Sequence, residues 1–199
     1  MPRSPRTDFA GAWHHVMNRG AHRHEIFSAD PDAELFLDSL AEASARYEIE
    51  IHAYCLMGNH YHLLVRSRTG RLSECIRFAV GRFSRTKNMR DGSDGPLFRS
   101  RFTSAPVESE AHLLECSRYI HLNPVRAGIV RAPEEWVWSS ARAYLGIGHA
   151  PDWLITHEML AMFGHLDSKR HYRDFLLDGM AMTDGVRPGG SDTGSEHEC

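Results

Sequence analysis

The hydrophobic and polar positions between residues 48 and 67 alternate with the two-residue period of β-strands. EIEIHAYCLM (48–57) is rich in β-branched residues, and the Gly-Asn dipeptide after it favours a tight turn. HYHLLVRS (60–67) follows directly, so these residues predict a β-hairpin. AWHHVMN (12–18) predicts an earlier strand, and RFTSAPV (101–107) predicts a later one.

Apolar residues spaced three and four apart predict three helices between and after the strands. The first covers residues 30–47, where Asp30 is placed to cap the helix and Pro31 suits its first turn. The second runs from about 72 to 87. The third covers 109–122, with a serine as its cap.

The resulting order is strand, helix, strand, strand, helix, strand, helix. This order predicts an α+β fold with a ferredoxin-like (RRM-like) antiparallel sheet and helices on one face. Short helical segments follow at 138–146, 156–164 and 168–177. We therefore expect a main domain at 1–146, a helical extension at 147–180 and a disordered Gly/Ser/acid-rich tail at 181–199.

The composition is that of a soluble globular protein, because 42% of the 199 residues are hydrophobic and 25% are charged. No apolar run approaches the length of a membrane span, and no signal-peptide core is visible. The four cysteines, Cys55, Cys75, Cys116 and Cys199, form no CxxC pair. We therefore expect reduced thiols in the cytoplasm rather than disulfides or a thiolate zinc site.

A basic segment lies in the middle of a chain whose net charge is only −3. Residues 66–101 contain ten Lys or Arg against three acids, whereas the residues after 177 contain five acids against one arginine. A positive segment can face a polyanion even in an acidic protein, although most charged runs are solvated helix faces. The candidate nucleic-acid-binding residues are Arg19, Arg66, Arg68, Arg77, Arg82, Arg85, Lys87, Arg99 and Arg101.

Two histidines lie two positions apart in the second strand of the hairpin. Side chains at i and i+2 of a strand share a face, so His60 and His62 point the same way while Tyr61 points to the other face. Two neutral imidazoles side by side suit a divalent cation, although a hydrogen-bonded polar patch is the simpler interpretation. Two ligands are too few for tight binding, so a metal site requires further ligands to converge there.

The third predicted helix carries a candidate nucleophile, Tyr119. Glu115 and Asn123 lie four residues before and after it, on the same face if the helix is regular. A phenol with a pKa near ~10 is a weak nucleophile at neutral pH, but a nearby cation stabilises its phenolate. Pro124 disfavours helix at the residue before it, so Asn123 could instead cap a new turn. A surface tyrosine without a catalytic role is the alternative.

Histidines nearer the N-terminus do not form an evident second metal site. His14 and His15 are adjacent on a strand and therefore face opposite ways. His22 and His24 fall in an expected loop. We therefore favour roles other than metal binding for these four side chains.

Four blocks, in order and spacing, carry a family resemblance: HYHLLV, GPLFRSRF, LLECSRYIHLNPVRAGIV and WSSARAYLG. With HHVMNRG and AYCLMGNHYHLLV, they cover most of residues 13–146. The sequence resembles the REP-associated tyrosine transposases, a bacterial branch of the single-tyrosine HUH transposases. Gly58 stands where relatives commonly have proline, a mild departure because glycine also suits the turn.

The resemblance implies a role for each matching residue. His60 and His62 would be the paired histidines that bind Mg²⁺ or Mn²⁺, and Tyr119 would be the nucleophile. Asn123 would be the third metal ligand, and Glu115 is the alternative. Tyr61 would be the packing residue between the two histidines.

The activity that the resemblance implies is a metal-dependent endonuclease and strand transferase acting on single-stranded or hairpin DNA of palindromic repeat elements. Attack by the tyrosine would leave a 5′-phosphotyrosine and a free 3′-hydroxyl, and its reversal would rejoin strands without ATP. The lack of a GxxxxGK[ST] phosphate loop agrees with this. Both a monomer and a homodimer are compatible with the resemblance.

Two other classes of protein compete with this interpretation. A domesticated relative could bind hairpin DNA without cutting it, because lost active-site geometry is invisible in a sequence. A metallo-β-lactamase-like hydrolase would need acids close behind its histidine pair, and HYHLLVRS supplies none. The hydrolase therefore ranks last.

Overall fold

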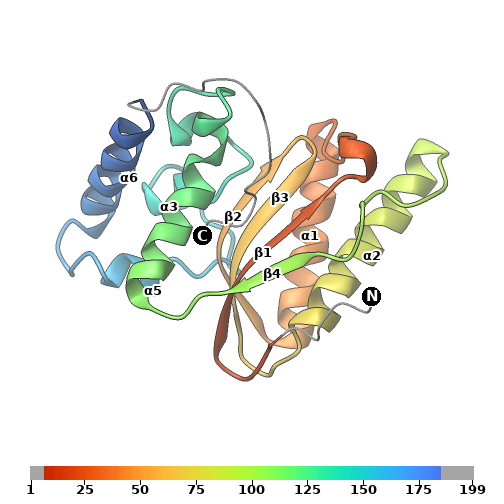
Figure 1. Cartoon of the computed structure of the whole chain (residues 1–199), viewed down its shortest axis with the longest axis horizontal. Helices are drawn as coiled ribbons and strands as arrows, with labels where there is room; N and C mark the ends of the chain where they lie inside the picture. The colour runs from red at the N-terminus through yellow and green to blue at the C-terminus, as the bar shows by residue number, and fades with distance from the viewer. Residues whose placement is uncertain (1–6, 185–199) are drawn as a thin grey trace.

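The centre of the protein is a four-stranded antiparallel sheet with the order β2-β3-β1-β4 (Figure 1). The computed structural model describes residues 7–184 of the chain. The strands are β1 (Ala12–Arg19), β2 (Ile49–Met57), β3 (His60–Ser67) and β4 (Thr103–Pro106). Strands β2 and β3 form the predicted hairpin, and β1 lies between β3 and the edge strand β4.

Two helices, α1 (Asp30–Tyr47) and α2 (Leu72–Asp91), pack side by side on one face of this sheet (Figure 1). Phe36 of α1 and Phe83 of α2 join sheet residues such as Leu63 in one buried hydrophobic cluster. The order of elements along the chain and the order of strands are those of a ferredoxin-like fold. The predicted fold class is confirmed.

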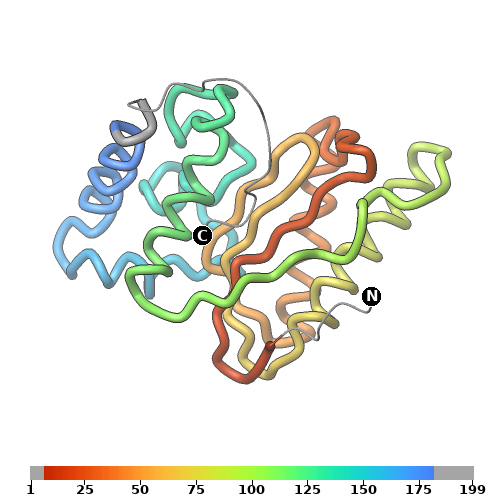
Figure 2. Tube along the Cα trace, viewed as in Figure 1, coloured from red at the N-terminus to blue at the C-terminus, as the bar shows by residue number. Residues whose placement is uncertain are grey.

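A third helix, α3 (Glu110–Arg126), packs against β2 and β3 on the opposite face, so only α1 and α2 share the face predicted for all the helices. The reason is that the central strands are apolar on both faces: Cys55 and Leu64 face α3 and would otherwise be exposed. Figure 2 shows the later segments beside α3, namely η2 (Pro133–Glu135), α4 (Ala141–Tyr144), α5 (His157–Ala161) and α6 (Ser168–Asp184). A further short helix, η1 (Ala21–Arg23), follows β1.

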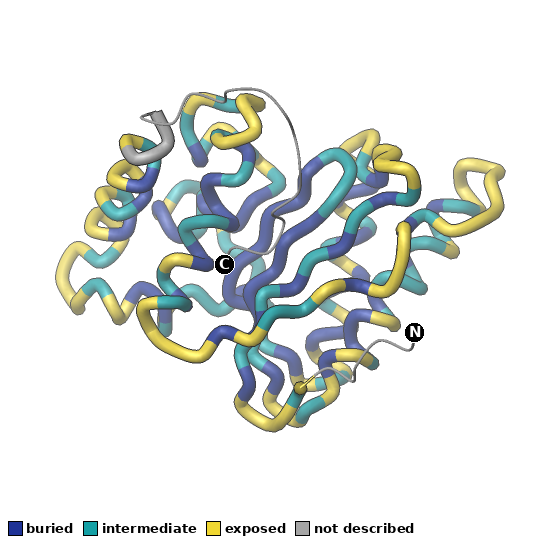
Figure 3. The backbone as a smooth tube through the Cα atoms, in the orientation of Figure 1, coloured by how far each residue is buried: buried dark blue, intermediate teal, exposed yellow. Residues whose placement is uncertain are grey.

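The segments after α3 share a second hydrophobic cluster with it. Tyr144, Tyr172 and Leu176 pack in this cluster with Ile120 of α3. Figure 3 shows that buried positions follow the central strands, whereas the loop after α2 is exposed. The predicted domain boundary at residue 146 stays a prediction. The prediction of a disordered tail from residue 181 is wrong for residues 181–184, which lie in α6; the remainder of the tail, with Cys199, lies outside the described residues.

Several helix ends differ from the predicted ones: α3 ends at Arg126 rather than at residue 122, and α6 ends at Asp184 rather than at residue 177. The N-cap of α1 is Ala29 rather than Asp30, and the carboxylate of Asp32 accepts the backbone N–H of Ser28 at 2.9 Å. Helix α2 ends four residues later than predicted, because the left-handed cap is Gly92, with a φ of 61°.

Three cysteines, Cys55, Cys75 and Cys116, are buried and free, as expected for reduced thiols. Burial raises the pKa of Cys75 to about 12, which keeps this thiol protonated and unreactive. Within residues 7–184, every helix is too short or too polar to cross a membrane.

Candidate active site

The pairing of β1 with β3 places the two histidines of β3 on the face that α3 covers. His60 lies opposite Arg19, and His62 lies opposite Met17. Their rings have centroids 5.1 Å apart and are nearly perpendicular, at 88°. Tyr61 points to the other face, where it is fully buried and its ring centroid lies 4.7 Å from that of Phe36. The alternation of side chains along β3 therefore places Tyr61 in the hydrophobic core and His60 and His62 on the opposite face of the sheet.

Helix α3 brings Tyr119 to the paired histidines. The centroid of its ring lies 5.5 Å from that of His62, at an interplanar angle of 87°. Tyr119 is half-buried, whereas His62 is only 4% exposed. The phenol and the histidine pair, which are more than fifty residues apart in sequence, thus line one site between the sheet and α3.

His15 of β1 is part of the same site. Its Nε2 lies 3.0 Å from Nδ1 of His62, the two rings are stacked with centroids 5.2 Å apart, and the ring of Tyr119 lies 5.8 Å away. Sequence analysis separated His15 from His14 correctly but did not assign it to the site. The missing information was the register: Met17 lies opposite His62, and His15 shares its face because it is two positions away.

His14 points to the opposite face of the sheet from His15, because successive side chains of a strand alternate between the two faces. Its Nε2 lies 3.2 Å from Asp8, and its Nδ1 lies 3.0 Å from the hydroxyl of Ser104. The backbone N–H of Leu72 donates to the same carboxylate at 2.8 Å. These contacts tie the start of the described chain to the N-terminus of α2 and give His14 a structural role.

Burial keeps His62 and His15 neutral. The pKa of His62 lies well below its ordinary value, first because of burial and then because of the nearby His15, His60 and Arg19. Burial, followed by the nearby His112, lowers the pKa of His15 to about 4. Neutral imidazole is the form that binds a metal ion.

Each paired histidine also has one ring nitrogen engaged by a neighbour. Nδ1 of His60 lies 2.7 Å from Oδ1 of Asn59, and Nδ1 of His62 lies 3.0 Å from His15. Such contacts orient a histidine and leave Nε2 for a metal ion, which is the usual arrangement around metal-binding histidines. The donor set therefore fits a divalent cation.

The two candidates for a third ligand differ in their surroundings. Helix α3 continues through Pro124, and the N–H of Ala127 donates to the carbonyl of Asn123 at 3.0 Å, so Asn123 stays in helical register with Tyr119. Glu115 is 55% exposed and pairs with Arg118 at 2.5 Å. A carboxylate held by an arginine is less available to a metal ion, so the surroundings favour Asn123.

Arg126 is a further residue of the site that sequence analysis did not assign. Its guanidinium carbon lies 5.3 Å from the centroid of the Tyr119 ring. Seven residues, or two helical turns, separate them, and this spacing was the available signal. The guanidinium over the ring face makes a cation–π contact that helps to hold the ring of Tyr119 in place.

The basic residues predicted to bind DNA fall into two groups. In the first group carboxylates engage the positive charge: Arg66 with Glu50 and Glu158, Arg68 with Glu50, Arg82 with Glu42, and buried Lys87 with Asp32 and Asp91. In the second group, within residues 7–184, no carboxylate pairs with Arg77, Arg85, Arg99 or Arg101. Arg19 lies close enough to His62 to lower its pKa.

A second cluster of metal-type side chains lies farther along β2 and β3. Glu50, His52 and Glu158 bring one ligand atom each within 4.8 Å of the others. The guanidinium of Arg66 already contacts both carboxylates, at 2.8 Å for Glu158, and supplies the neutralising charge. Burial lowers the pKa of His52 to about 4. The cluster therefore has the character of an ion-pair network between β2, β3 and α5.

Comparison with known proteins identifies the family of the chain. Residues 9–123, more than half of the chain, match the family model described as "Transposase IS200 like". The "Putative REP-associated tyrosine transposase" of Haemophilus influenzae is 25% identical over 116 residues, which are 53% of this chain and 66% of that relative. The chain thus spans slightly less than two thirds of the length of this relative.

A solved structure described as a REP-associated tyrosine transposase bound to a REP hairpin has a similar fold, with a TM-score of 0.63. It is 18% identical, and the match covers 78% of this chain and 92% of that one. The resemblance to REP-associated tyrosine transposases is thereby confirmed. The chain belongs to the family of IS200-like transposases.

Proposed function

We propose that the protein cuts and rejoins single-stranded or hairpin DNA through Tyr119, with a divalent metal ion bound beside it. The observation that carries this proposal is the position of the Tyr119 ring 5.5 Å from that of His62, next to His60. A nucleophile and neutral nitrogen ligands within one site are what metal-assisted phosphodiester chemistry needs.

Three side chains would hold the metal ion: His60, His62 and Asn123. Mg²⁺ or Mn²⁺ would polarise the scissile phosphate and offset the negative charge that develops on its oxygens. His15 would orient His62 through the contact between their ring nitrogens. The half-buried position of the site limits the access of water to it.

The phenol oxygen of Tyr119 would attack phosphorus in line with the bond to the 3′-oxygen. A bond forms between Tyr119 and the 5′-phosphate while the bond to the 3′-oxygen breaks, and the phenol proton is balanced by the new 3′-hydroxyl. Arg126 would help to hold the ring of Tyr119 in place during this step. The phosphotyrosine retains the phosphodiester energy, so a 3′-hydroxyl can reverse the reaction without ATP.

The proposed substrate follows from the structural relative, which is bound to a REP hairpin. The basic residues without carboxylate partners, together with Arg19, would contact DNA phosphates. Such contacts position the backbone without reading its sequence. We retain Arg66, Arg68, Arg82 and Lys87 as weaker candidates, because acids already neutralise their charge.

The test is a covalent adduct on a labelled REP hairpin with a single-stranded flank. The parent protein with Mn²⁺ should give a band shift that survives denaturation, and Tyr119→Phe should give none. Tyr47→Phe, a change remote from the site, is the matched control. If the Tyr119→Phe variant cleaves as well as the parent, the nucleophile is another residue. Hairpin binding without an adduct in Mg²⁺, Mn²⁺ or Zn²⁺ would favour a binding protein without cleavage.

A further inference from the structure

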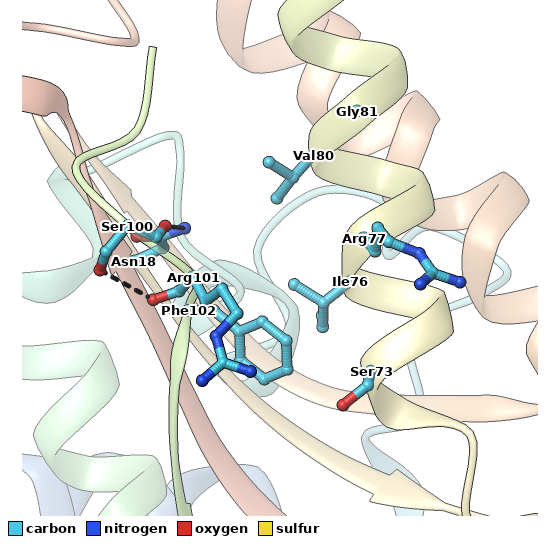
Figure 4. A pocket seen from close by; sticks show the side chains of 9 residues that line it. All are labelled: Asn18, Ser73, Ile76, Arg77, Val80, Gly81, Ser100, Arg101 and Phe102. Carbon is cyan, nitrogen blue, oxygen red and sulfur yellow. Dashed lines mark hydrogen bonds between the residues drawn. The ribbon is translucent and has the colours of Figure 1, made fainter. Parts of the chain in front are cut away.

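A cavity of about 450 Å³ lies between α2 and residues 100–102, which lead into β4 (Figure 4). It lies on the sheet face opposite to the one that α3 covers. We call it the α2–β4 cavity and define it by its lining residues: Asn18, Ser73, Ile76, Arg77, Val80, Gly81, Ser100, Arg101 and Phe102. We propose that this cavity receives one unpaired nucleobase of the DNA, while Arg77 and Arg101 hold the adjoining phosphates. The inference rests on the proposed function.

The lining has the chemistry that a nucleobase needs. Figure 4 shows Ile76 and Val80 pointing from α2 toward the strand side of the cavity, where Phe102 lies. Apolar and aromatic side chains hold bases by stacking and by exclusion of water, whatever the base identity. The cavity volume falls in the range of small-molecule sites and leaves room for one base.

Positive charge complements this apolar lining. Arg77 and Arg101 both line the cavity, and within residues 7–184 neither pairs with a carboxylate. On the same helix, Arg82 and Lys87 are paired with acids. Unpaired arginines beside an apolar pocket suit an occupant with a flat apolar body and an anionic attachment, as a nucleotide has.

Gly81 explains why the cavity is open. Glycine destabilises the interior of a helix relative to alanine, and Gly81 lies in the middle of the 20-residue α2. A Cβ atom built at this position meets no atom of another segment within 4 Å, so packing against other segments does not demand glycine. The absent side chain instead enlarges the α2–β4 cavity.

The cavity is close enough to the proposed active site for one DNA strand to reach both. His62 lies opposite Met17 on β1, and Met17 lies opposite Thr103 on the edge strand β4. Two inter-strand spacings of ~4.8 Å therefore separate His62 from the edge of the sheet. Phe102 is the residue just before Thr103 and faces α2. A DNA strand that rounds the β4 edge can therefore place one base in the cavity while another phosphate of the same strand lies at Tyr119.

The test combines protein variants that reduce the cavity with DNA probes in which single bases are removed. Gly81→Leu should occupy part of the cavity, from a position where a Cβ atom meets no other segment, and Gly81→Ala is the matched control that leaves the cavity open. The probe is a fluorescein-labelled REP hairpin with a single-stranded flank, in EDTA to prevent cleavage. Each unpaired nucleotide is replaced in turn by an abasic one, and circular dichroism checks that each variant is folded.

With the parent and with Gly81→Ala, one abasic position should weaken binding by at least about fivefold. Gly81→Leu should bind the intact probe as weakly as the parent binds that abasic probe, and should be insensitive to the change. Arg77→Gln and Arg101→Gln should each lower the slope of log affinity against log salt by about 1, unlike Arg170→Gln on α6.

An equal affinity of Gly81→Leu and the parent, or a flat abasic scan, would overturn the inference. If the parent still forms the Tyr119 adduct in that case, only the role of the cavity is wrong. If the parent neither binds the hairpin nor forms the adduct, the proposed function fails with it. Should Gly81→Leu not fold, a flat abasic scan with the parent or unchanged salt slopes for the arginine variants would still overturn the inference.

Discussion

Nε2 of His15 lies 3.0 Å from Nδ1 of His62, and the two rings stack across β1 and β3. The contact joins a residue of the first strand to one of the two histidines proposed to bind metal. It holds the His62 ring in one orientation and leaves its Nε2 for the metal ion. His15, a half-buried neutral histidine, is thus a positioning residue.

Replacement of His15 should weaken metal binding without removing a ligand. We expect His15→Phe to lower the affinity for Mn²⁺ by about 10- to 100-fold, because the orientation of His62 is lost. Isothermal titration calorimetry measures the affinity, and His24→Ala in the loop after β1 is the control. An unchanged affinity would show that His62 needs no such support.

The third metal ligand can be identified by a pair of variants on α3. Asn123→Ala should lower Mn²⁺ affinity at least about tenfold and slow cleavage, because an oxygen ligand is removed. Glu115→Ala should leave both nearly unchanged, because this carboxylate already pairs with Arg118 and is 55% exposed. The opposite ranking of the two variants would assign the ligand to Glu115.

The two groups of basic residues should respond differently to neutralisation. Arg99→Gln should reduce the salt slope of hairpin binding by about 1, because an exposed arginine would release one counterion on contact with phosphate. Lys87→Met should leave the slope unchanged and lower the free energy of unfolding by roughly 3 kcal/mol, since buried Asp32 loses a partner. Fluorescence anisotropy at several salt concentrations and urea denaturation provide the two measurements. A smaller slope for Lys87→Met would restore this lysine to the DNA-binding set.

A buried polar network should contribute to the stability of the α3 face. The hydroxyl of Tyr172 donates to Ser117 at 3.0 Å and lies 2.6 Å from Nδ1 of His121, while Nε2 of His121 lies 2.7 Å from Ser140. Tyr172→Phe should lower the free energy of unfolding by about 2 kcal/mol, because buried partners lose a hydrogen bond. Urea denaturation measures it, with Tyr47→Phe for comparison. Equal stability of the two variants would show that the network contributes little.

Stability should fall as the solution is acidified from pH 6.5 toward pH 4. Burial lowers the pKa of His15 and His52 to about 4 and that of His121 to about 3. Between these pH values the unfolded chain binds more protons than the folded protein, so protonation favours unfolding. The full stabilising contribution of the three neutral histidines is therefore present only above pH 6.5. Each of these histidines should lower the free energy of unfolding at pH 5 by on the order of 2 kcal/mol relative to pH 7.

Denaturation in urea at pH 7 and pH 5 checks this dependence. His52→Gln should remove on the order of 2 kcal/mol of the stability change between pH 7 and pH 5, or about 1 kcal/mol per pH unit. The same dependence in parent and variant would show that His52 titrates in the folded protein as it does in the unfolded chain.

The local patterns of the chain were sufficient to predict much of this protein. Alternation predicted the β2–β3 hairpin, the shared face of His60 and His62 and the inward position of Tyr61, because side-chain direction in a strand depends only on position parity. Helical spacing predicted α1, α2 and most of α3, and the four sequence blocks indicated the family.

Only the tertiary structure decided which distant residues meet. The register of β1 against β3 brings His15 rather than His14 to the site, and α3 covers the second face of the sheet because both faces of the central strands are apolar. Glu158, which pairs with Arg66, and Asp32, which pairs with Lys87, lie far from these residues in the sequence, so the ion pairs could not be assigned from the basic segment alone. Local periods determine where a side chain points, whereas its partner depends on strand register and packing between segments far apart in the chain.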